Sequence, residues 1–168
     1  GITFAPNSGL TIRAGARHRD IERDAAVREH YPLLHETFRK VAQPRIRNMA
    51  TIGGNLCQGD PLTDPGASLI VLDATVELQS AKGKRTLSLE EFFVDYYETA
   101  LGPGELLTEI RLPPPKRQLR WAHIKFTPRS VEDFATIGVA LAIEVHDGNC
   151  ADLRLALDER KEADEFAK

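Results

Sequence analysis

The sequence predicts an α+β fold in which an antiparallel sheet with hairpins is flanked by short helices. Three observations favour this fold class. Several segments alternate apolar and polar residues with the period of two that is typical of a half-buried strand. Tight turns of the hairpin type, Lys82-Gly83-Lys84 and Asp147-Gly148, join neighbouring segments of this kind. The helical segments are short, and they do not alternate regularly with strands as they would around a parallel sheet.

The first third of the chain contains one strand and several helical turns. Residues 10–14 alternate as a strand, and Asp20 can cap the helical turn that follows. Pro32 suits the first position of a helix whose apolar residues have helical spacing, and Pro44 ends that helix. Residues 45–65 are polar and rich in glycine and proline, so we expect a long loop there, and loops of this length are often functional.

The middle of the chain predicts a helix and a hairpin. Residues 67–72 form a short buried helix, and residues 75–79 and 85–87 are the two strands of the hairpin. Ser88 and Glu91 have the spacing of a capping box, which marks the start of another helix.

The last part of the chain is almost entirely strand. Residues 106–112 alternate up to the proline run 113–115, which is the best internal boundary in the sequence. Beyond it, residues 122–126, 137–145 and 153–157 are three further strands, the last two joined at Asp147-Gly148.

Composition excludes several classes of partner. The chain has 168 residues, of which 42% are hydrophobic, and a formal net charge of −3. No basic field attracts nucleic acid, and no apolar run approaches the length of a membrane span. The two cysteines, Cys57 and Cys150, have no metal-type spacing, so we expect no metal site, no disulfide framework and a reducing, cytoplasmic setting. A start without methionine and a charged end indicate a fragment.

The segment Thr51-Ile52-Gly53-Gly54-Asn55 carries the clearest functional signal. Two adjacent glycines remove side-chain bulk where backbone amides can converge on an anion such as a diphosphate. We therefore predict a tight, exposed turn in which the amides of residues 53–55 point into one concavity. The pattern is neither a Walker loop nor a dinucleotide-binding fingerprint, and an ordinary Gly-Gly turn is the alternative interpretation.

A longer set of motifs resembles the flavin-binding subunit of the molybdenum hydroxylases. This family includes the medium subunits of carbon monoxide dehydrogenases and the central flavin portion of xanthine dehydrogenase. The similar segments occur in the family's order and cover residues 10–157. They read IRAGARHRDIERD, HYPLL, TIGGNLCQGDP, LDATVELQS, LEEFF, YYETAL, ELLTEIRLP and RSVEDFATIGVALAIE.

The resemblance implies FAD as the cofactor and assigns roles to single positions. The diphosphate-binding motif corresponds to Thr51, Ile52, Gly53, Gly54 and Asn55. Asp64 matches a carboxylate that contacts the cofactor. Leu107 and Lys125 match an apolar contact and a group near the polar edge of the flavin ring, and Val41 matches a residue at the border of the site. Core packing for Leu107 and Val41 and a solvated surface position for Lys125 are the alternatives. No catalytic side chain is expected, because the redox chemistry belongs to the flavin.

The resemblance also implies a domain division and two departures from the family. Residues 1–115 correspond to the central FAD-binding subdomain, residues 116–157 to the beginning of a C-terminal subdomain, and residues 158–168 to a charged tail without counterpart. The family's first flavin motif, an Ala-Gly-Gly-Thr type of turn, has no match here. Because half of the diphosphate cradle is missing, we expect this chain alone to bind FAD weakly or not at all.

The function implied is electron transfer. In the family, electrons pass from a large molybdopterin-binding subunit through two 2Fe-2S clusters in a small subunit to the flavin, and then to an external acceptor. The alternative hypothesis is a non-enzymatic fragment that docks to these subunits but no longer retains FAD. An unrelated hydrolase with a phosphate-like loop is a third interpretation.

Overall fold

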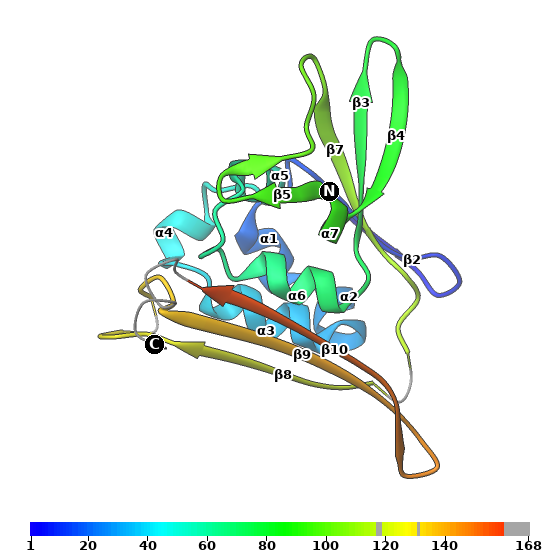
Figure 1. The fold of residues 1–168 in the computed structure, drawn as a ribbon, viewed down its shortest axis with the longest axis vertical. Helices are drawn as coiled ribbons and strands as arrows, with labels where there is room; N and C mark the ends of the chain where they lie inside the picture. Colours follow the sequence, from blue (N-terminus) through cyan, green and yellow to red (C-terminus); the bar gives the residue numbers. More distant parts are fainter. Residues whose placement is uncertain (117–118, 131, 160–168) are drawn as a thin grey trace.

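The computed structural model describes residues 1–116, 119–130 and 132–159 and contains two antiparallel sheets with helices between them (Figure 1). The first sheet has five strands in the order β1-β2-β7-β3-β4. Its strands are β1 (Ile2–Ala5), β2 (Gly9–Arg13), β7 (Leu106–Leu112), β3 (Thr75–Ser80) and β4 (Gly83–Ser88). The second sheet has three strands in the order β10-β9-β8. Its strands are β10 (Asn149–Glu159), β9 (Ile137–His146) and β8 (Leu119–Phe126). These sheets and the short helices confirm the predicted α+β class.

Seven helices and one small pair of strands complete the described chain. The pair consists of β5 (Phe93–Asp95) and β6 (Glu98–Thr99). The helices are α1 (His18–Arg23), α2 (Ala25–His30), α3 (Pro32–Lys40), α4 (Pro44–Arg47), α5 (Ile52–Gln58), α6 (Pro65–Val71) and α7 (Leu89–Phe92).

The first sheet contains a pairing between segments that lie far apart in the sequence. Strand β2 pairs with β7, so that Leu10 lies opposite Leu112 and Ile12 opposite Ile110. Strand β7 also pairs with β3 and carries a bulge, where Thr108 is the extra residue. Because of this extra residue, Leu107 faces the buried side together with Ile110 and Leu112, although strict alternation would place it on the opposite face.

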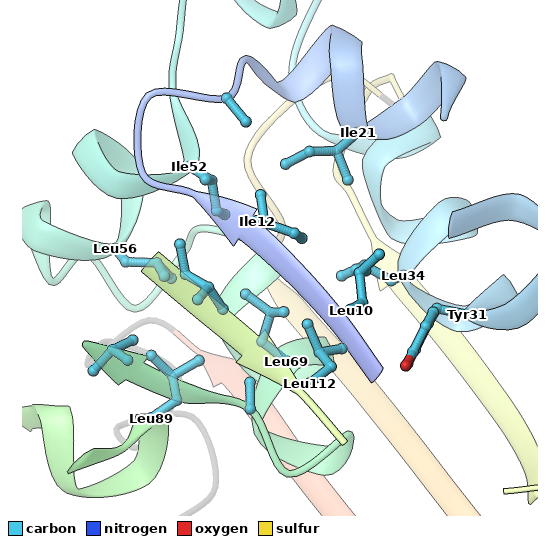
Figure 2. Packing of buried hydrophobic residues seen from close by; sticks show 14 of the residues in the cluster. Leu10, Ile12, Ile21, Tyr31, Leu34, Ile52, Leu56, Leu69, Leu89 and Leu112 are labelled. Atoms are coloured by element: carbon cyan, nitrogen blue, oxygen red, sulfur yellow. The ribbon is translucent and has the colours of Figure 1, made fainter. Parts of the chain in front are cut away.

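The main hydrophobic core lies between the first sheet and the helices. Figure 2 shows Leu10 and Ile12 of β2 directed towards the same space as Ile21 and Leu34 from the helices and Ile52 at the start of α5. All five side chains have no exposed surface. A second, smaller cluster joins α3 and α6 to the second sheet. Its members are Leu33, Ala67, Val71, Ala140 and Ala142. The helices therefore form a middle layer that packs on a sheet at either side (Figure 1).

Local signals place several element ends where the sequence predicts them. Pro32 is the first residue of α3, where the missing amide hydrogen costs no helical hydrogen bond. Ser88 accepts from the backbone N–H of Glu91, and the Glu91 carboxylate accepts from the backbone N–H of Ser88. Asp147 and Gly148 both have positive φ, 51° and 79°, as the β9–β10 hairpin turn requires.

Three sequence predictions about elements are wrong, and strand β1 was not predicted. Pro44 does not end α3, which stops at Lys40, but begins α4. The expected loop 45–65 contains most of α4 and all of α5. Asp20 does not cap α1 but lies inside it, where its carboxylate accepts from the backbone N–H of Arg17. Strand β1 was not expected, because its four residues are too few to show a period.

The proline run 113–115 lies between the two sheets. Apart from the separate pair β5-β6, the strands before it pair in the first sheet and the strands after it in the second. Helices α3 and α6 nevertheless pack against the second sheet as well. A division of the chain at residue 115 stays a prediction. Strand β10 continues through Asp158 and Glu159, two residues that we assigned to the tail. The rest of that tail lies outside the described residues.

Two expectations from composition concern membranes and cysteines. No helix in the described part of the chain is long and apolar enough to cross a membrane. Cys57 is half-buried, Cys150 is exposed, and both thiols are free.

Candidate functional site

The motif Thr51–Asn55 forms the start of helix α5. Thr51 is the N-cap, and its side-chain oxygen accepts a hydrogen bond of 3.2 Å from the backbone N–H of Gly54. The helix ends at Gly59, whose φ of 63° is the left-handed conformation that glycine adopts without strain. Both ends of α5 are therefore encoded by the local sequence.

The predicted exposed turn with converging amides is wrong. Gly53 and Gly54 lie inside α5, and the four amides from Ile52 to Asn55 already have partners within the chain. The N–H of Ile52 donates to the carbonyl of Ala16 (3.0 Å) and that of Gly53 to the carbonyl of Ala14 (2.9 Å). The N–H of Asn55 donates to the carbonyl of Thr51 (3.0 Å). The amides of Ile52 and Gly53 hold α5 against the segment that follows β2.

The two glycines have different structural roles. A Cβ at position 53 would lie 2.6 Å from the Ala14 Cβ and 2.9 Å from the Ala14 carbonyl oxygen, so only glycine allows α5 to approach this segment. Gly54 is exposed, and a Cβ there would meet only the Thr51 side-chain oxygen, at 3.1 Å. Gly53 is therefore required for packing, whereas Gly54 leaves the surface of the first turn bare.

Asp64 and Lys125 form a buried ion pair. Lys125 Nζ lies 2.8 Å from Asp64 Oδ2, and the side chains are 2% and 5% exposed, respectively. The ammonium also donates to the carbonyl oxygen of Lys40 at the end of α3 (3.0 Å). The solvated surface position that we considered for Lys125 is therefore wrong. Strand β8 and the residue that precedes α6 bring these two side chains together across 61 positions of sequence.

The second oxygen of Asp64 has no hydrogen-bond partner among the described residues, although it is buried. Burial raises the pKa of Asp64, and Lys125 opposes that rise by stabilising the carboxylate. The side-chain oxygen of Asn55 is buried and unpartnered in the same sense. Both atoms are acceptors, so both sites suit a ligand that offers O–H or N–H donors.

Two further titratable groups lie close to this pair. Burial, together with the negative charge of Asp64, raises the pKa of Asp158 to about 8. Burial, together with the positive charges of Lys40 and Lys125, lowers the pKa of His123 to about 4. At neutral pH both groups are mostly uncharged.

Leu107 and Val41 are parts of the main core, 8% and 5% exposed. Leu107 lies on β7, against which α5 packs, so it is close to the glycine motif. Val41 follows the last residue of α3, and its carbonyl oxygen accepts from the Arg47 guanidinium (2.8 Å). Core packing accounts for both residues, and their contact with a flavin stays a prediction.

Sequence reasoning missed the buried Arg47. Its guanidinium also donates to the carbonyl of Ala42 (2.6 Å) and lies 3.0 Å from the carboxylate of Glu22 in α1. This cation therefore joins the end of α3 to α1, directly before the glycine motif. No spacing signal reveals it, because its partners are backbone carbonyls and a carboxylate 25 positions away.

Two cavities of the described residues lie elsewhere. One of about 330 Å³ is bordered by Gly66, Phe93 and Asp158, and one of about 610 Å³ by His30 and Trp121. None of the eight predicted site residues lines either cavity. Within the described ranges, no group of three or more His, Cys, Asp or Glu side chains could hold a metal ion.

Comparison with known proteins identifies the family. A model of the FAD binding domain in molybdopterin dehydrogenase matches residues 2–115. The chain belongs to this family. FAD is accordingly the cofactor of this FAD-binding domain, as the sequence resemblance implied.

Relatives and solved structures agree with this assignment. A xanthine dehydrogenase FAD-binding subunit of Escherichia coli O157:H7 is 33% identical over 157 residues, which are 93% of this chain and 54% of the relative. A carbon monoxide dehydrogenase medium chain of Afipia carboxidovorans is 37% identical over 126 residues, 75% of this chain and 43% of the relative. The solved carbon monoxide dehydrogenase of Hydrogenophaga pseudoflava superposes with a TM-score of 0.89 at 33% identity, covering 94% of this chain and 54% of that chain. This FAD-binding domain thus spans about half the length of the curated relatives that it matches.

The chemistry of the site fits FAD. The unpartnered oxygens of Asp64 and Asn55 need hydrogen-bond donors, and a flavin dinucleotide carries ribityl and ribose hydroxyls and a ring N–H. The bare surface at Gly54 would admit a close backbone approach.

Proposed function

We propose that this chain is the FAD-holding part of the flavin subunit of a molybdenum hydroxylase. One observation carries the assignment to residues. The buried Asp64 carboxylate is held on one oxygen by Lys125, while its other oxygen is left without a partner. A carboxylate fixed in this way can accept a hydrogen bond without moving, because its charge is already balanced.

The site residues would divide the work of binding. Thr51, Gly54 and Asn55 would border the diphosphate at the start of α5, while Ile52 and Gly53 fix the position of that helix through the core. Asp64 would accept a hydrogen bond from the cofactor, and Lys125 would place positive charge near the polar edge of the ring. Leu107 would supply apolar contact, with Val41 at the border. Bound FAD supplies the redox chemistry, so the chain itself needs no nucleophile or acid–base pair.

The electron route and the partners belong to the same proposal. The relatives include medium chains of dehydrogenases, which supports a place between other subunits. We infer a small 2Fe-2S subunit that delivers electrons, a large molybdopterin-binding subunit that oxidises the substrate, and an external acceptor beyond the flavin. The two free thiols agree with a reducing, cytoplasmic setting for this assembly.

Titration of FAD into the purified chain, followed by flavin fluorescence, tests the proposed site. We expect weak, saturable binding in the micromolar range, because one of the family's two diphosphate motifs is present. Gly54→Val should weaken it at least about tenfold by obstructing close approach at α5. Gln58→Val is the matched control, because it adds the same side chain at an exposed position of the same helix.

A second pair of variants tests the carboxylate. Asp64→Asn should weaken FAD binding, whereas Asp95→Asn, at an exposed aspartate of β5, should leave it unchanged. Circular dichroism of each variant shows whether the fold is retained. Equal affinities for Asp64→Asn and Asp95→Asn would contradict the role of Asp64.

One observation favours the alternative function, a fragment that docks to partner subunits without FAD. The amides from Ile52 to Asn55 are all engaged within the chain and would have to share or exchange these partners to bind a diphosphate. Unchanged flavin fluorescence up to about 100 μM FAD would support this alternative. A submicromolar dissociation constant for FAD would exclude this alternative. It would also show that the motif Thr51–Asn55 is sufficient without the family's first flavin motif.

A further inference from the structure

One row of the second sheet brings two buried titratable side chains to the same face. Gly138 of the middle strand β9 pairs with Lys125 of β8 on one side and with Asp158 of β10 on the other. Cross-strand partners direct their side chains to one face of a sheet, and here that face packs on α3 and α6. We call it the inner face of this sheet and the opposite one its outer face. The Lys125 side chain is 2% exposed and Asp158 is 6% exposed, so the row is buried.

Gly138 leaves room for the Asp158 carboxyl group. A Cβ at position 138 would lie 3.1 Å from Asp158 Oδ2 and 3.2 Å from the Asp158 Cβ, both tighter than ordinary van der Waals contact. The Asp158 side chain therefore lies over the middle strand, in the direction of Lys125.

Asp64 brings a second carboxyl group to the same cation. Its Oδ2 atom lies 2.8 Å from Lys125 Nζ, whereas Asp158 has no ion pair among the described residues. The other carboxylate oxygen of Asp64 and the Oδ2 atom of Asp158 are both buried without a hydrogen-bond partner in the described chain. One ammonium group thus serves two carboxyl groups and balances the charge of the one that it contacts.

A second ionised carboxylate in this place would be buried without compensation, so Asp158 retains its proton near neutral pH. Burial and the negative charge of Asp64 raise the pKa of Asp158 to about 8, although the backbone N–H of Ala67 and the charge of Lys125 oppose the rise. The direct contact with Lys125 keeps Asp64 as the ionised member of the pair of acids.

The surroundings of Asp158 supply no second cation in contact with it among the described residues. Helix α6, which packs on β10, contains no titratable side chain. Asp60 and Asp95 border the same cavity as Asp158, and Arg154 of β10 is engaged with Asp73. The other titratable groups close to the row are Asp64, Lys125 and His123, with Lys40 and Glu36 of α3.

We propose that Asp158 is a positioning residue of the FAD site, where its proton keeps Lys125 on Asp64 and loss of that proton weakens FAD binding. This role rests on the FAD site proposed above. An ionised Asp158 would draw Lys125 away from Asp64, which would then lose the fixed orientation in which its second oxygen accepts a hydrogen bond from the cofactor. It would also add negative charge to a site that receives the negatively charged diphosphate. Because linkage is reciprocal, bound FAD should raise the affinity of Asp158 for its proton.

Carbon-13 NMR of the aspartate carboxyl groups in the 168-residue chain tests the proton without FAD. One carboxyl group should titrate with a midpoint near pH 8, well above the value of about 4 for exposed aspartates. Asp158→Asn should remove this titration, because asparagine has the shape of the protonated acid but cannot ionise. Asp152→Asn is the matched control, because it makes the same change on the same strand at a side chain 42% exposed, and it should retain the titration.

Titration with FAD, followed by flavin fluorescence at about pH 7 and pH 9, tests the coupling. The dissociation constant of the unchanged chain and of Asp152→Asn should rise at least about fivefold between these pH values. Asp158→Asn should bind FAD with nearly the same affinity at both, close to that of the unchanged chain at pH 7. Circular dichroism establishes that both variants keep the fold.

The outcomes separate this role from the proposed function. FAD binding by the unchanged chain that is equal at both pH values, or a pH dependence that persists in Asp158→Asn, would overturn the role of Asp158 and leave the FAD site in place. A chain in which no aspartate titrates between about pH 6 and pH 9 would overturn it as well. Absence of FAD binding at both pH values would contradict the proposed function, and the carboxyl titration would still decide whether Asp158 holds the proton.

Discussion

The two sheets of this molecule distribute polar and apolar side chains in opposite ways. The first sheet buries large aliphatic residues against the helices, and its other face carries ion pairs, among them Arg111 Nη2 with Glu77 Oε2 (2.8 Å). The second sheet places small residues and charged groups against the helices, such as Ala140, Ala142 and Lys125, and large aliphatic residues outside.

The difference shows that the side chains on each face of a sheet indicate whether another layer packs on that face. The first sheet is complete with one partner layer, because its polar face is stable in water. The second sheet has an inner face adapted to close approach by α3 and α6, and an outer face that water does not stabilise. Small inner side chains also leave room for the buried pair of Lys125 and Asp64.

Loss of the buried pair should have the largest effect. Lys125→Met leaves the Asp64 carboxylate buried without its cation, and we expect a loss of about 3–5 kcal/mol in the free energy of unfolding. Lys84→Met removes a half-exposed cation from Glu77 of the first sheet and should cost much less. Urea unfolding followed by fluorescence of Trp121 measures both. Equal losses in the free energy of unfolding would contradict the expectation that the buried ion pair of the second sheet contributes more than the exposed ion pair of the first.

His123 on the inner face of the second sheet should give the next largest effect, a contribution to stability that depends on pH. The pKa of His123 is lowered to about 4 from 6.5, so the unfolded chain binds the proton more tightly. The stabilisation is complete above pH 6.5 and is lost as the pH falls towards 4, by about 3 kcal/mol in total.

His123→Gln removes this titration. Because the raised pKa of Asp158 gives the opposite pH dependence, the difference between variant and unchanged chain is the quantity to measure. As the pH falls from 6.5 to 4, the free energy of unfolding of the variant should rise relative to that of the unchanged chain, measured by urea unfolding at several pH values. A variant with the unchanged pH slope would show that other groups cause the acid sensitivity.

Close packing against the first sheet depends on one glycine. Gly53→Ala places a Cβ 2.6 Å from that of Ala14, so α5 must move, and we expect a loss of about 2 kcal/mol. Gly54→Ala is the natural comparison. It meets only the Thr51 side chain at an exposed helix position and should change stability by less than about 1 kcal/mol. Thermal unfolding of both variants measures the contrast, and a larger loss for Gly54→Ala would contradict it.

Substitution on the outer face should have the smallest effect on folding. Leu153→Thr, at a side chain 58% exposed, should change the free energy of unfolding by less than about 0.5 kcal/mol. Ala142→Leu, on the inner face of the same sheet, should cost about 1–3 kcal/mol through overpacking. A larger loss at position 153 would mean that the outer face is already covered by residues of this chain.

Most of the fold could be predicted from local patterns. The strands 75–79, 106–112, 122–126 and 137–145 are confirmed, because alternation with period two reflects burial of one face directly. Local patterns did not predict helix α5. Two glycines in a polar segment predict a turn, but a tertiary contact with Ala14, which no local pattern contains, stabilises the helix.

The candidate site depended on family resemblance rather than on pattern. Asp64 and Lys125 lie 61 positions apart in the sequence, and no pattern in the residues around them predicts an ion pair. Their resemblance to family positions predicted a common site, and in the structure their side chains form an ion pair. What they bind cannot follow from their pairing alone, since a buried ion pair is also compatible with a purely structural role.

The pairing of β2 with β7 has a consequence for folding during synthesis on the ribosome. Leu10 and Leu112 are neighbours in the first sheet, although about a hundred residues separate them. At a synthesis rate of about 5–20 residues per second, the nascent strand β2 waits roughly 5–20 s before β7 leaves the ribosome. During that interval Leu10 and Ile12 lack their final partner, which makes β2 a natural binding site for chaperones that recognise exposed apolar strands.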